Sequence, residues 1–316
     1  MKEFTVSQSE AGKRLDKYIA GIIKNAPASF CYKMLRKKNI VLNGKKATGS
    51  EALNCGDVIT FYLSDETFDK FSARSQSVSG LTHLMPPVVY EDEDVLIVNK
   101  PSGMLTQRSS ANDTSLNEIC LSYLYDKGSI DDKSLMTFVP SVCNRLDRNT
   151  SGLVTFGKTY KGAKTLADHF KKRTVHKFYG CIAYGIIKED LELKGSLVKD
   201  ADTNTVTVSD DDKDGAFIHT KIHPVRAGYD ITLCDVCLIT GKTHQIRAHL
   251  AHIGHAIIGD YKYGNRKVND AFKAKYGIDS QLLACYKMLF PDDTALGPLA
   301  GKSVTCDLPD IFEKVM

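Results

Sequence analysis

Apolar and polar residues near the start of the chain alternate with the periods of two amphipathic helices and a small sheet. Over residues 15–23 the apolar side chains recur at i, i+3, i+4, i+7 and i+8, which predicts a helix with one buried stripe. Ser29 is expected to cap a second helix. Short apolar runs at 40–42 and 58–63, bounded by glycine-containing turns, predict β-strands. We therefore expect a two-helix and hairpin unit over residues 1–63.

The pattern changes after this unit. Serines and Gly80 interrupt every apolar period over residues 64–84, where we expect a linker. From residue 85 to residue 316, short apolar runs alternate with Gly and Asp turns. Strand-like runs occur at 88–90, 95–98, 178–183, 206–208, 217–222 and 231–239, and helical periods at 160–171 and 243–253. Because strands do not alternate regularly with helices, we expect an α+β chain whose second domain has a mixed, mainly antiparallel sheet.

The composition fits this two-domain interpretation. The 316 residues are 42% hydrophobic and 25% charged, which is typical of a globular protein and excludes a disordered, collagen-like or coiled-coil chain. No apolar run approaches the ~18 residues of a membrane span, and the first residues do not resemble a signal peptide. The nine cysteines are an odd number in a long chain, which indicates reduced thiols. We expect a cytoplasmic monomer with no membrane association and no obligate protein partner.

The net charge of +4 conceals a strongly basic segment. Residues 13–46 contain ten Lys and Arg side chains against the single acid Asp16. Four of the bases form a cluster at the end of the predicted second helix: Lys33, Arg36, Lys37 and Lys38. A concentrated basic patch suits a polyphosphate partner such as RNA, and the alternative is a solvated basic face with no ligand.

The order of elements favours RNA. Residues 13–63 resemble the small RNA-binding module of ribosomal small-subunit protein four, through segments 14–17, 36–38, 41–45 and 56–59. The resemblance implies recognition of the shape and backbone of folded RNA.

Two metal hypotheses have little support. Cys234 and Cys237 match C-x-x-C, but on a strand side chains three positions apart point to opposite faces. His249 and His252 share a face of a predicted helix without a nearby carboxylate, and Arg247 is adjacent. The chain also lacks P-loop, G-x-G-x-x-G, H-E-x-x-H and G-x-S-x-G motifs. We therefore expect no metal site and no nucleotide cofactor.

The densest group of polar residues is segment 144–152, Asn-Arg-Leu-Asp-Arg-Asn-Thr-Ser-Gly. Taken alone it is typical of a polar turn in which Asp147 caps the next element. Together with 100–104, 177–179 and 240–247, however, it resembles the motif set of pseudouridine synthases that act on ribosomal RNA, in the branch named after its dual rRNA and tRNA member. The likeness extends from Val88 to about Gly264. A preceding basic module is also found in the large-subunit rRNA members of that family.

The resemblance implies that the chain isomerises uridine to pseudouridine in RNA, most often large-subunit rRNA, without a redox or metal cofactor. It implies an essential ionised carboxylate at Asp147, which attacks ribose C1′ or uracil C6 or assists a glycal route. Arg247 corresponds to the family's basic partner of that carboxylate, and Tyr179 to the aromatic residue that stacks on the flipped uracil. Other expected substrate contacts are Arg145, Ile246 and His244.

The remaining residues of these motifs and the alternative functions lead to further expectations. Segments 100–101 and 150–152 are interpreted as scaffolding for the loop that bears Asp147. Asn144 stands where the family usually has His, and we expect this to alter local hydrogen bonding rather than the reaction. A synthase acting on tRNA shares the same chemistry. A non-catalytic RNA-binding or ribosome-assembly factor would explain the basic module equally well, but it would not need Asp147, Tyr179 and Arg247 together.

Overall fold

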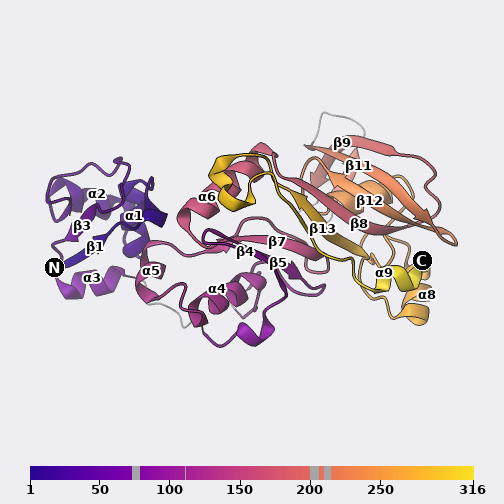
Figure 1. Cartoon of the computed structure of the whole chain (residues 1–316), viewed down its shortest axis with the longest axis horizontal. Coiled ribbons are helices and arrows are strands. Elements are labelled where there is room, and N and C mark those ends of the chain that lie inside the picture. The colour runs from indigo at the N-terminus through magenta and orange to yellow at the C-terminus, as the bar shows by residue number, and fades with distance from the viewer. Residues whose placement is uncertain (73–78, 111, 200–205, 210–214) are drawn as a thin grey trace.

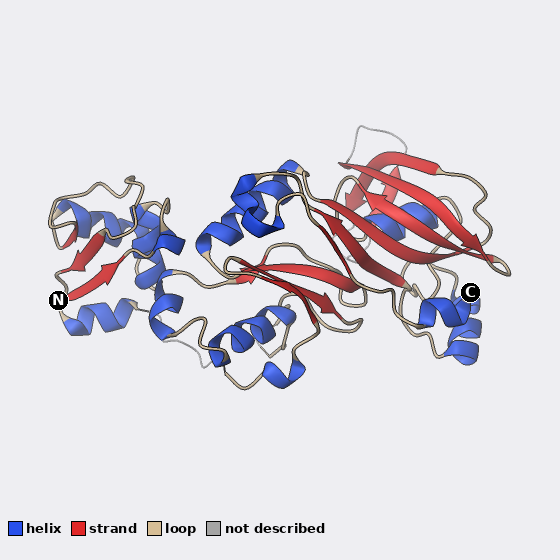
Figure 2. Cartoon of the chain, in the orientation of Figure 1, coloured by secondary structure: helices blue, strands red, loops and turns tan. Residues whose placement is uncertain are grey.

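The computed structural model of the chain describes residues 1–72, 79–110, 112–199, 206–209 and 215–316. The molecule is elongated, with the N-terminal unit at one end and the C-terminus at the other (Figure 1). One large sheet extends from the middle of the molecule to its C-terminal end (Figure 2). The two expected regions, a small basic unit and a larger sheet-containing part, are therefore both present.

The N-terminal unit contains the two helices and short strands that the periodicity predicts. Its sheet is antiparallel in the order β1-β3-β2. The apolar stripe of the first helix, with Leu15, Ile19 and Ile22, lies in the core of the unit. The strands and helices are β1 (Lys2–Thr5), α1 (Leu15–Ile22), α2 (Ala28–Arg36), β2 (Ile40–Leu42) and β3 (Val58–Phe61).

Two local predictions in this unit were wrong or incomplete. The second helix begins at Ala28, so Ser29 lies inside its first turn and is not the cap. The capping position is occupied by the extended residue Pro27, which makes no side-chain capping bond. Strand β1 was not predicted, because four residues with a single buried side chain give too short a pattern.

The linker prediction is also wrong for part of its range. Ser64 caps helix α3 (Asp65–Phe71), because its Oγ accepts a hydrogen bond from the Thr67 backbone N–H at 3.2 Å. Phe68 is buried, with its ring centroid 5.7 Å from that of Phe61, so the helix belongs to the N-terminal core. The Phe71 ring centroid also lies 4.7 Å from that of Phe30, so two aromatic side chains anchor a helix otherwise rich in charge. Ser75 and Ser77, on which the prediction partly relied, lie outside the described residues.

The larger sheet confirms the predicted α+β class and mainly antiparallel character. Its strands follow the order β10-β9-β11-β12-β8-β13-β7-β5-β4, with β14 beside β13 and β6 beside β7. Among the strand pairs of the described residues, β13 and β7 run parallel and the others run antiparallel. The strands are β4 (Val88–Glu91), β5 (Val95–Lys100), β6 (Ser141–Val142), β7 (Ser151–Gly157), β8 (His176–Tyr184), β9 (Leu191–Lys199), β10 (Val206–Ser209), β11 (Ala216–Ala227), β12 (Ile231–Leu238), β13 (Leu283–Leu289) and β14 (Ser303–Thr305).

Helices pack around this sheet. Residues 160–171 and 243–253 were predicted as helices and form α6 and α7, whereas the periods of α4 and α8 were not recognised. In the described part of the chain, no helix is long and apolar enough to cross a membrane. The helices are α4 (Leu116–Asp126), α5 (Asp132–Thr137), α6 (Tyr160–Lys172), α7 (Gln245–His252), α8 (Arg266–Tyr276) and α9 (Ile311–Val315), with 3-10 turns at Gln8–Glu10, Thr82–Leu84 and Thr294–Leu299.

The N-terminal unit contacts the rest of the chain through α1, α5 and α6. The ammonium of Lys13 donates a hydrogen bond to the carbonyl of Thr137 and lies 5.4 Å from the ring centroid of Tyr160. A Cβ added at Gly21 on α1 would lie 3.0 Å from the Thr137 carbonyl oxygen, so glycine permits this close approach. The basic unit is thus packed against the domain that carries the larger sheet.

Candidate active site

Asp147 lies in the loop between β6 and β7, and hydrogen bonds from buried side chains fix that loop. The ammonium of Lys100, at the end of β5, donates to the carbonyls of Pro101, Met104 and Arg148 at 2.9, 2.9 and 3.0 Å. Lys100 is fully buried, and this burial lowers its pKa to about 8. Segment 100–101 therefore has the scaffolding contacts that its sequence suggested.

Segment 150–152 lies where the loop joins β7. Gly152 has a φ of +109°, and a Cβ at this position would collide with the backbone of Cys285 on β13. Glycine alone permits this close parallel pairing without strain. Gln281 donates to the hydroxyl of Thr150 at 3.4 Å, which ties the same end of the loop to the segment before β13.

Asn144 anchors the other end of the Asp147 loop. Its side-chain oxygen accepts hydrogen bonds from the backbone and hydroxyl of Thr155 on β7, at 2.7 and 2.9 Å. Its amide donates to the carbonyl of Leu153 at 3.4 Å. Within the described residues, the side chain is thus engaged with β7 rather than with Asp147.

Thr106 provides a further anchor that the sequence did not reveal. Its hydroxyl donates to the carbonyl of Leu146 at 2.8 Å and accepts from the Leu146 backbone at 3.2 Å, one residue before Asp147. Thr106 is 3% exposed. We expect Thr106→Val to lower the free energy of unfolding by about 1–3 kcal/mol, because two buried backbone groups are left without their partner.

Urea denaturation of Thr106→Val measures that destabilisation. Thr305→Val, on the exposed face of β14, is the control and should stay within about 0.5 kcal/mol of the wild type. Equal stability of the two variants would show that the Thr106 hydroxyl does not hold the loop.

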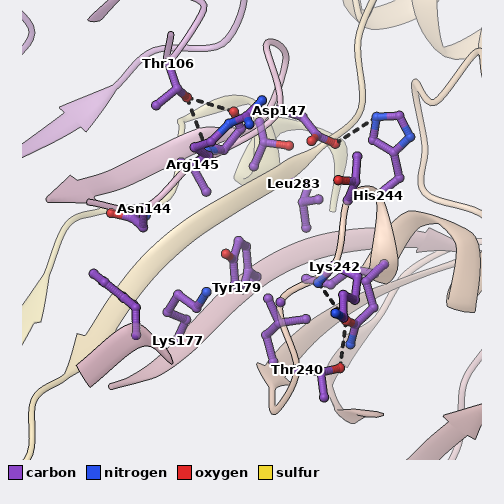
Figure 3. Close-up of a pocket in the computed structure, with 18 of the residues that line it drawn as sticks. Thr106, Asn144, Arg145, Asp147, Lys177, Tyr179, Thr240, Lys242, His244 and Leu283 are labelled. Atoms are coloured by element: carbon purple, nitrogen blue, oxygen red, sulfur yellow. Dashed lines mark hydrogen bonds and ion pairs between the residues drawn. The ribbon is translucent and has the colours of Figure 1, made fainter. Parts of the chain in front are cut away.

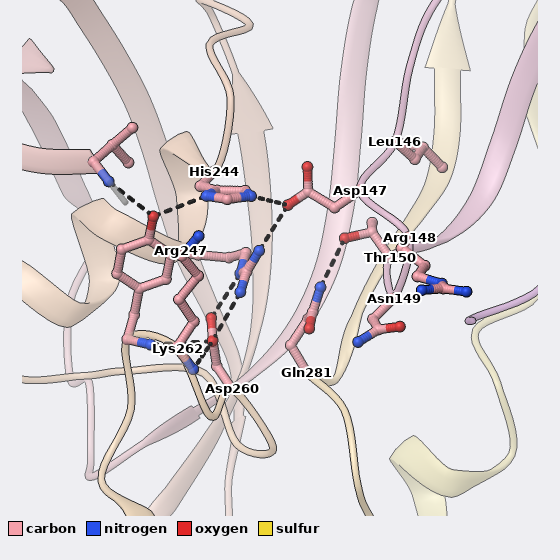
Figure 4. A network of polar contacts seen from close by, with 12 residues as sticks. Leu146, Asp147, Arg148, Asn149, Thr150, His244, Arg247, Asp260, Lys262 and Gln281 are labelled. Carbon is pink, nitrogen blue, oxygen red and sulfur yellow. Dashed lines mark hydrogen bonds and ion pairs between the residues drawn. The ribbon is translucent and has the colours of Figure 1, made fainter. Parts of the chain in front are cut away.

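Helix α7 brings the candidate basic partner to Asp147. The Arg247 Nη1 atom donates to Asp147 Oδ2 at 2.9 Å, and the two residues are 100 positions apart in the chain (Figure 4). Arg247 is 7% exposed, whereas the Asp147 side chain retains 26% exposure. The sequence-predicted pair therefore meets in the structure, with the carboxylate accessible and the guanidinium buried.

A buried carboxylate, Asp260, holds Arg247 from the opposite side. Arg247 Nε and Nη2 donate to the two Asp260 oxygens at 2.7 and 2.9 Å. Burial alone would lower the pKa of Arg247, but the ion pairs with Asp260 and Asp147 outweigh it and raise that pKa. Asp260 was not predicted, although an acid separated by only Gly259 from the apolar pair Ile257 and Ile258 was a signal that could have been followed.

His244 lies beside Arg247 and approaches the same oxygen of Asp147. Its Nε2 atom is 3.7 Å from Asp147 Oδ2, and its Nδ1 atom is 2.8 Å from the hydroxyl of Tyr263 (Figure 4). Like Asp260, Tyr263 was not predicted as a site residue. Burial lowers the pKa of His244 below its ordinary value despite the nearby Asp147 carboxylate. At neutral pH the imidazole is therefore uncharged, and Arg247 supplies the positive charge beside Asp147.

Tyr179 lies in the same cleft, whose volume is about 790 Å³ (Figure 3). The residue is on the central strand β8 and is 5% exposed. Burial, with the neighbouring Cys285 thiol, raises the pKa of Tyr179 well above its ordinary value. The phenol is therefore neutral, and an aromatic ring faces the cavity that also contains the Asp147 carboxylate.

The remaining predicted residues fall into two groups. Arg145, Ile246 and His244 line the cleft with Asp147, Tyr179 and Arg247. The four predicted basic residues of the N-terminal unit, by contrast, do not line it and lie on the surface at the end of α2: Lys33, Arg36, Lys37 and Lys38. In the described residues, no group of three or more His, Cys, Asp and Glu side chains could hold a metal ion.

Comparison with known proteins places the chain in one family. Residues 94–252 match the family model described as RNA pseudouridylate synthase. The ribosomal large subunit pseudouridine synthase C of Vibrio vulnificus is 26% identical, with 98% of this chain and 94% of the relative covered. The protein of the same name from Rickettsia bellii is 30% identical, with coverage of 97% and 98%.

Another relative and a solved structure agree with these matches. A protein of Mycoplasma capricolum named an uncharacterized RNA pseudouridine synthase is 31% identical, with 85% of this chain and 87% of the relative covered. The structure of human RNA Pseudouridylate Synthase Domain Containing 4 superposes with a TM-score of 0.57 at 19% identity, covering 72% of this chain and 90% of that one. The fold of the larger domain is thus that of a pseudouridylate synthase.

Proposed function

The chain belongs to the RNA pseudouridylate synthase family, and on this basis we propose that it converts uridines to pseudouridines in large-subunit ribosomal RNA. The relatives from Vibrio vulnificus and Rickettsia bellii, which match nearly their whole length, carry that substrate in their names. The reaction breaks the bond between ribose C1′ and uracil N1 and forms one between C1′ and C5. C5 loses a proton and N1 gains one, so the conversion is redox-neutral and needs no cofactor.

The state of the Asp147 carboxylate is the observation that supports this chemistry most directly. One oxygen, Oδ2, accepts the hydrogen bond from Arg247, while Oδ1 has no hydrogen-bond partner in the described residues. The arginine pairs with the carboxylate and fixes its orientation. The second oxygen is then available to a substrate in the cleft, as either a nucleophile or a base requires.

We assign the other cleft residues to substrate binding. Tyr179 offers a ring on which a flipped uracil stacks, and Ile246 supplies an apolar wall. Arg145 is exposed at the cleft, next but one to Asp147, where it reaches the place left by the flipped base or a neighbouring phosphate. His244, held by Tyr263, lies beside the carboxylate.

We propose that the N-terminal unit binds the RNA backbone, and that it comprises residues 1–63 together with helix α3, whose Phe68 packs in the same core. Its cluster of Lys33, Arg36, Lys37 and Lys38 is exposed and forms no ion pair with a described residue. Because the unit packs against α5 and α6, it would hold RNA in a fixed relation to the cleft. Residues 85–316 then form the catalytic domain.

Neutralising that cluster should weaken RNA binding and make it less dependent on salt. We expect the fourfold Gln variant of Lys33, Arg36, Lys37 and Lys38 to reduce the slope of log K against log salt by about 0.7–0.9 for each phosphate that the protein no longer neutralises. The measurement is filter binding of large-subunit rRNA at several salt concentrations.

The matched control removes the same number and types of charge at the other end of the molecule, on α8. It carries Gln at Arg266, Lys267, Lys273 and Lys275, all of which are exposed. An equal decrease of affinity in both variants would mean that net charge, rather than the N-terminal unit, governs RNA binding.

Tritium release tests the proposed function itself. Large-subunit rRNA transcribed with 5-tritiated uridine should release tritium when incubated with the full-length protein, because C5 loses its proton. Small-subunit rRNA and tRNA transcripts serve as the comparison substrates. Preferential release from tRNA would assign the enzyme to tRNA, and binding without release from any transcript would indicate a non-catalytic RNA-binding factor.

A further inference from the structure

The cleft that contains Asp147 is strongly cationic. Asp147 is the one acid among the described residues that line it, and it is already bound to Arg247. Several bases share the same lining: Arg145, Arg148, Arg173, Lys177 and Lys242. Most of these are exposed, but the ammonium of Lys177 lies inside the cleft.

The position of Lys177 is set by the central strand β8. It precedes Tyr179 by two positions, so both side chains point to the same face of the sheet, as Figure 3 shows. A Cβ added at Gly241, in the turn before α7, would lie 3.2 Å from the Lys177 Nζ atom. The ammonium is also 5.7 Å from the ring centroid of Phe170. Lys177 is therefore enclosed between the sheet, α6 and the turn that leads to Arg247.

The Lys177 ammonium lacks an acceptor in the part of the chain that the structure describes. In the described residues it makes no hydrogen bond or ion pair, and the neighbouring thiol of Cys285 is kept neutral because burial raises its pKa to about 12. Lys100 shows the contrast, because its buried ammonium donates to three carbonyl oxygens. Burial lowers the pKa of Lys177, as expected for a cation that is removed from water without gaining a partner.

The Lys177 ammonium is a hydrogen-bond donor beside Tyr179, the ring proposed to stack on the base. Such a donor can stabilise negative charge that forms on the base in the proposed reaction. When the bond between C1′ and N1 breaks, its electron pair stays on the uracil, and the negative charge spreads over N1 and the carbonyl oxygens O2 and O4. Exposed bases at the cleft edge, such as Arg145 and Lys242, are available to phosphates. Lys177 is reached only by a group that enters the cleft.

We propose that Lys177 donates a hydrogen bond to a carbonyl oxygen of the flipped uracil and stabilises the negative charge that the ring carries after glycosidic cleavage. Lys177 keeps its proton throughout, while C5 later attacks C1′ and releases its own proton. This inference rests on the proposed function, and it adds a catalytic residue to Asp147, Tyr179 and Arg247. Donors aimed at developing charge typically contribute about 10²–10³-fold in rate.

The test compares full-length Lys177→Met and Lys177→Arg with the wild type in single-turnover tritium release from large-subunit rRNA at saturating enzyme. We expect Lys177→Met to slow release by about 10²-fold or more with little change in RNA affinity, and Lys177→Arg to recover part of the rate. Lys287→Met is the control: this residue on β13 packs over Phe178 on the opposite face of the same sheet. Its release rate should equal that of the wild type.

Thermal melting separates catalysis from structure. Removing an unpartnered, half-buried charge should leave the melting temperature of Lys177→Met equal to or above that of the wild type, whereas removing a structural lysine would lower it. A release rate within about threefold of the wild type, or weaker RNA binding with an unchanged saturated rate, would overturn the inference. The inference would also be overturned if Lys177→Met melted at a lower temperature than the wild type while Lys177→Arg kept full activity. Absence of release by the wild type would instead refute the proposed function, and with it this role.

Discussion

Asp147→Asn is expected to reduce the rate of pseudouridine formation by about 10⁴-fold or more, as removal of a central catalytic side chain typically does. The amide occupies the same space and can still meet Arg247, but it carries no charge and cannot serve as nucleophile or base. The substitution leaves the loop anchors Lys100, Thr106 and Asn144 untouched.

Tritium release and RNA binding, measured on the same preparation, check this expectation. Binding should persist, because the Asp147 carboxylate repels phosphate and the basic cluster on α2 is unchanged. Asp270→Asn, an exposed acid on α8, is the control and should keep full activity. Release by Asp147→Asn at more than about a hundredth of the wild-type rate would remove Asp147 from the centre of the mechanism.

Asp260→Ala is expected to cost about 3–5 kcal/mol in the free energy of unfolding, because it leaves a buried guanidinium without its bidentate partner. Asp260 is 1% exposed and also accepts backbone hydrogen bonds from Lys262 and Tyr263 at 3.0 and 3.2 Å. Arg247 would then be free to turn away from Asp147. Activity should therefore fall even at temperatures where the variant remains folded.

Urea denaturation and tritium release at low temperature measure these two effects separately. Asp270→Ala is the comparison, because its pair with Arg266 is 3.8 Å long and exposed, and such pairs contribute about 0–1 kcal/mol. If Asp260→Ala proved as stable and as active as Asp270→Ala, the Asp260 carboxylate would not be what holds Arg247 in place.

The sequence predicted the parts of the fold that local periodicity encodes. The apolar stripe of α1 and the strand-like runs at 88–90 and 95–98, which form β4 and β5, are confirmed, because each depends on a local pattern of apolar residues. Helix α3 was missed because only two aromatic residues, Phe68 and Phe71, anchor it, which gives too short an apolar pattern. Strand β7 was not recognised as a strand because all seven of its residues are buried, so it shows no alternation.

Resemblance to a family identified Asp147, Tyr179, Arg145, Ile246, His244 and Arg247 as candidates, and the structure gathers them in one cleft. The residues that support them could not be predicted, because their partners are distant in sequence. Thr106 is 40 positions from Leu146, and Asp260 meets Arg247 only because the chain turns back after α7. Lys177 stood within a recognised motif, but its lack of a partner is a property of the folded chain alone.

Pseudouridine mapping in cells tests the central claim most directly. Ribosomal RNA would be sequenced from cells with the gene, without it, and without it but supplied with wild-type protein or Asp147→Asn. We predict that one or more pseudouridines of the large-subunit rRNA disappear on deletion and return with the wild type but not with Asp147→Asn. Retention of every large-subunit pseudouridine after deletion, or restoration by Asp147→Asn, would contradict the account.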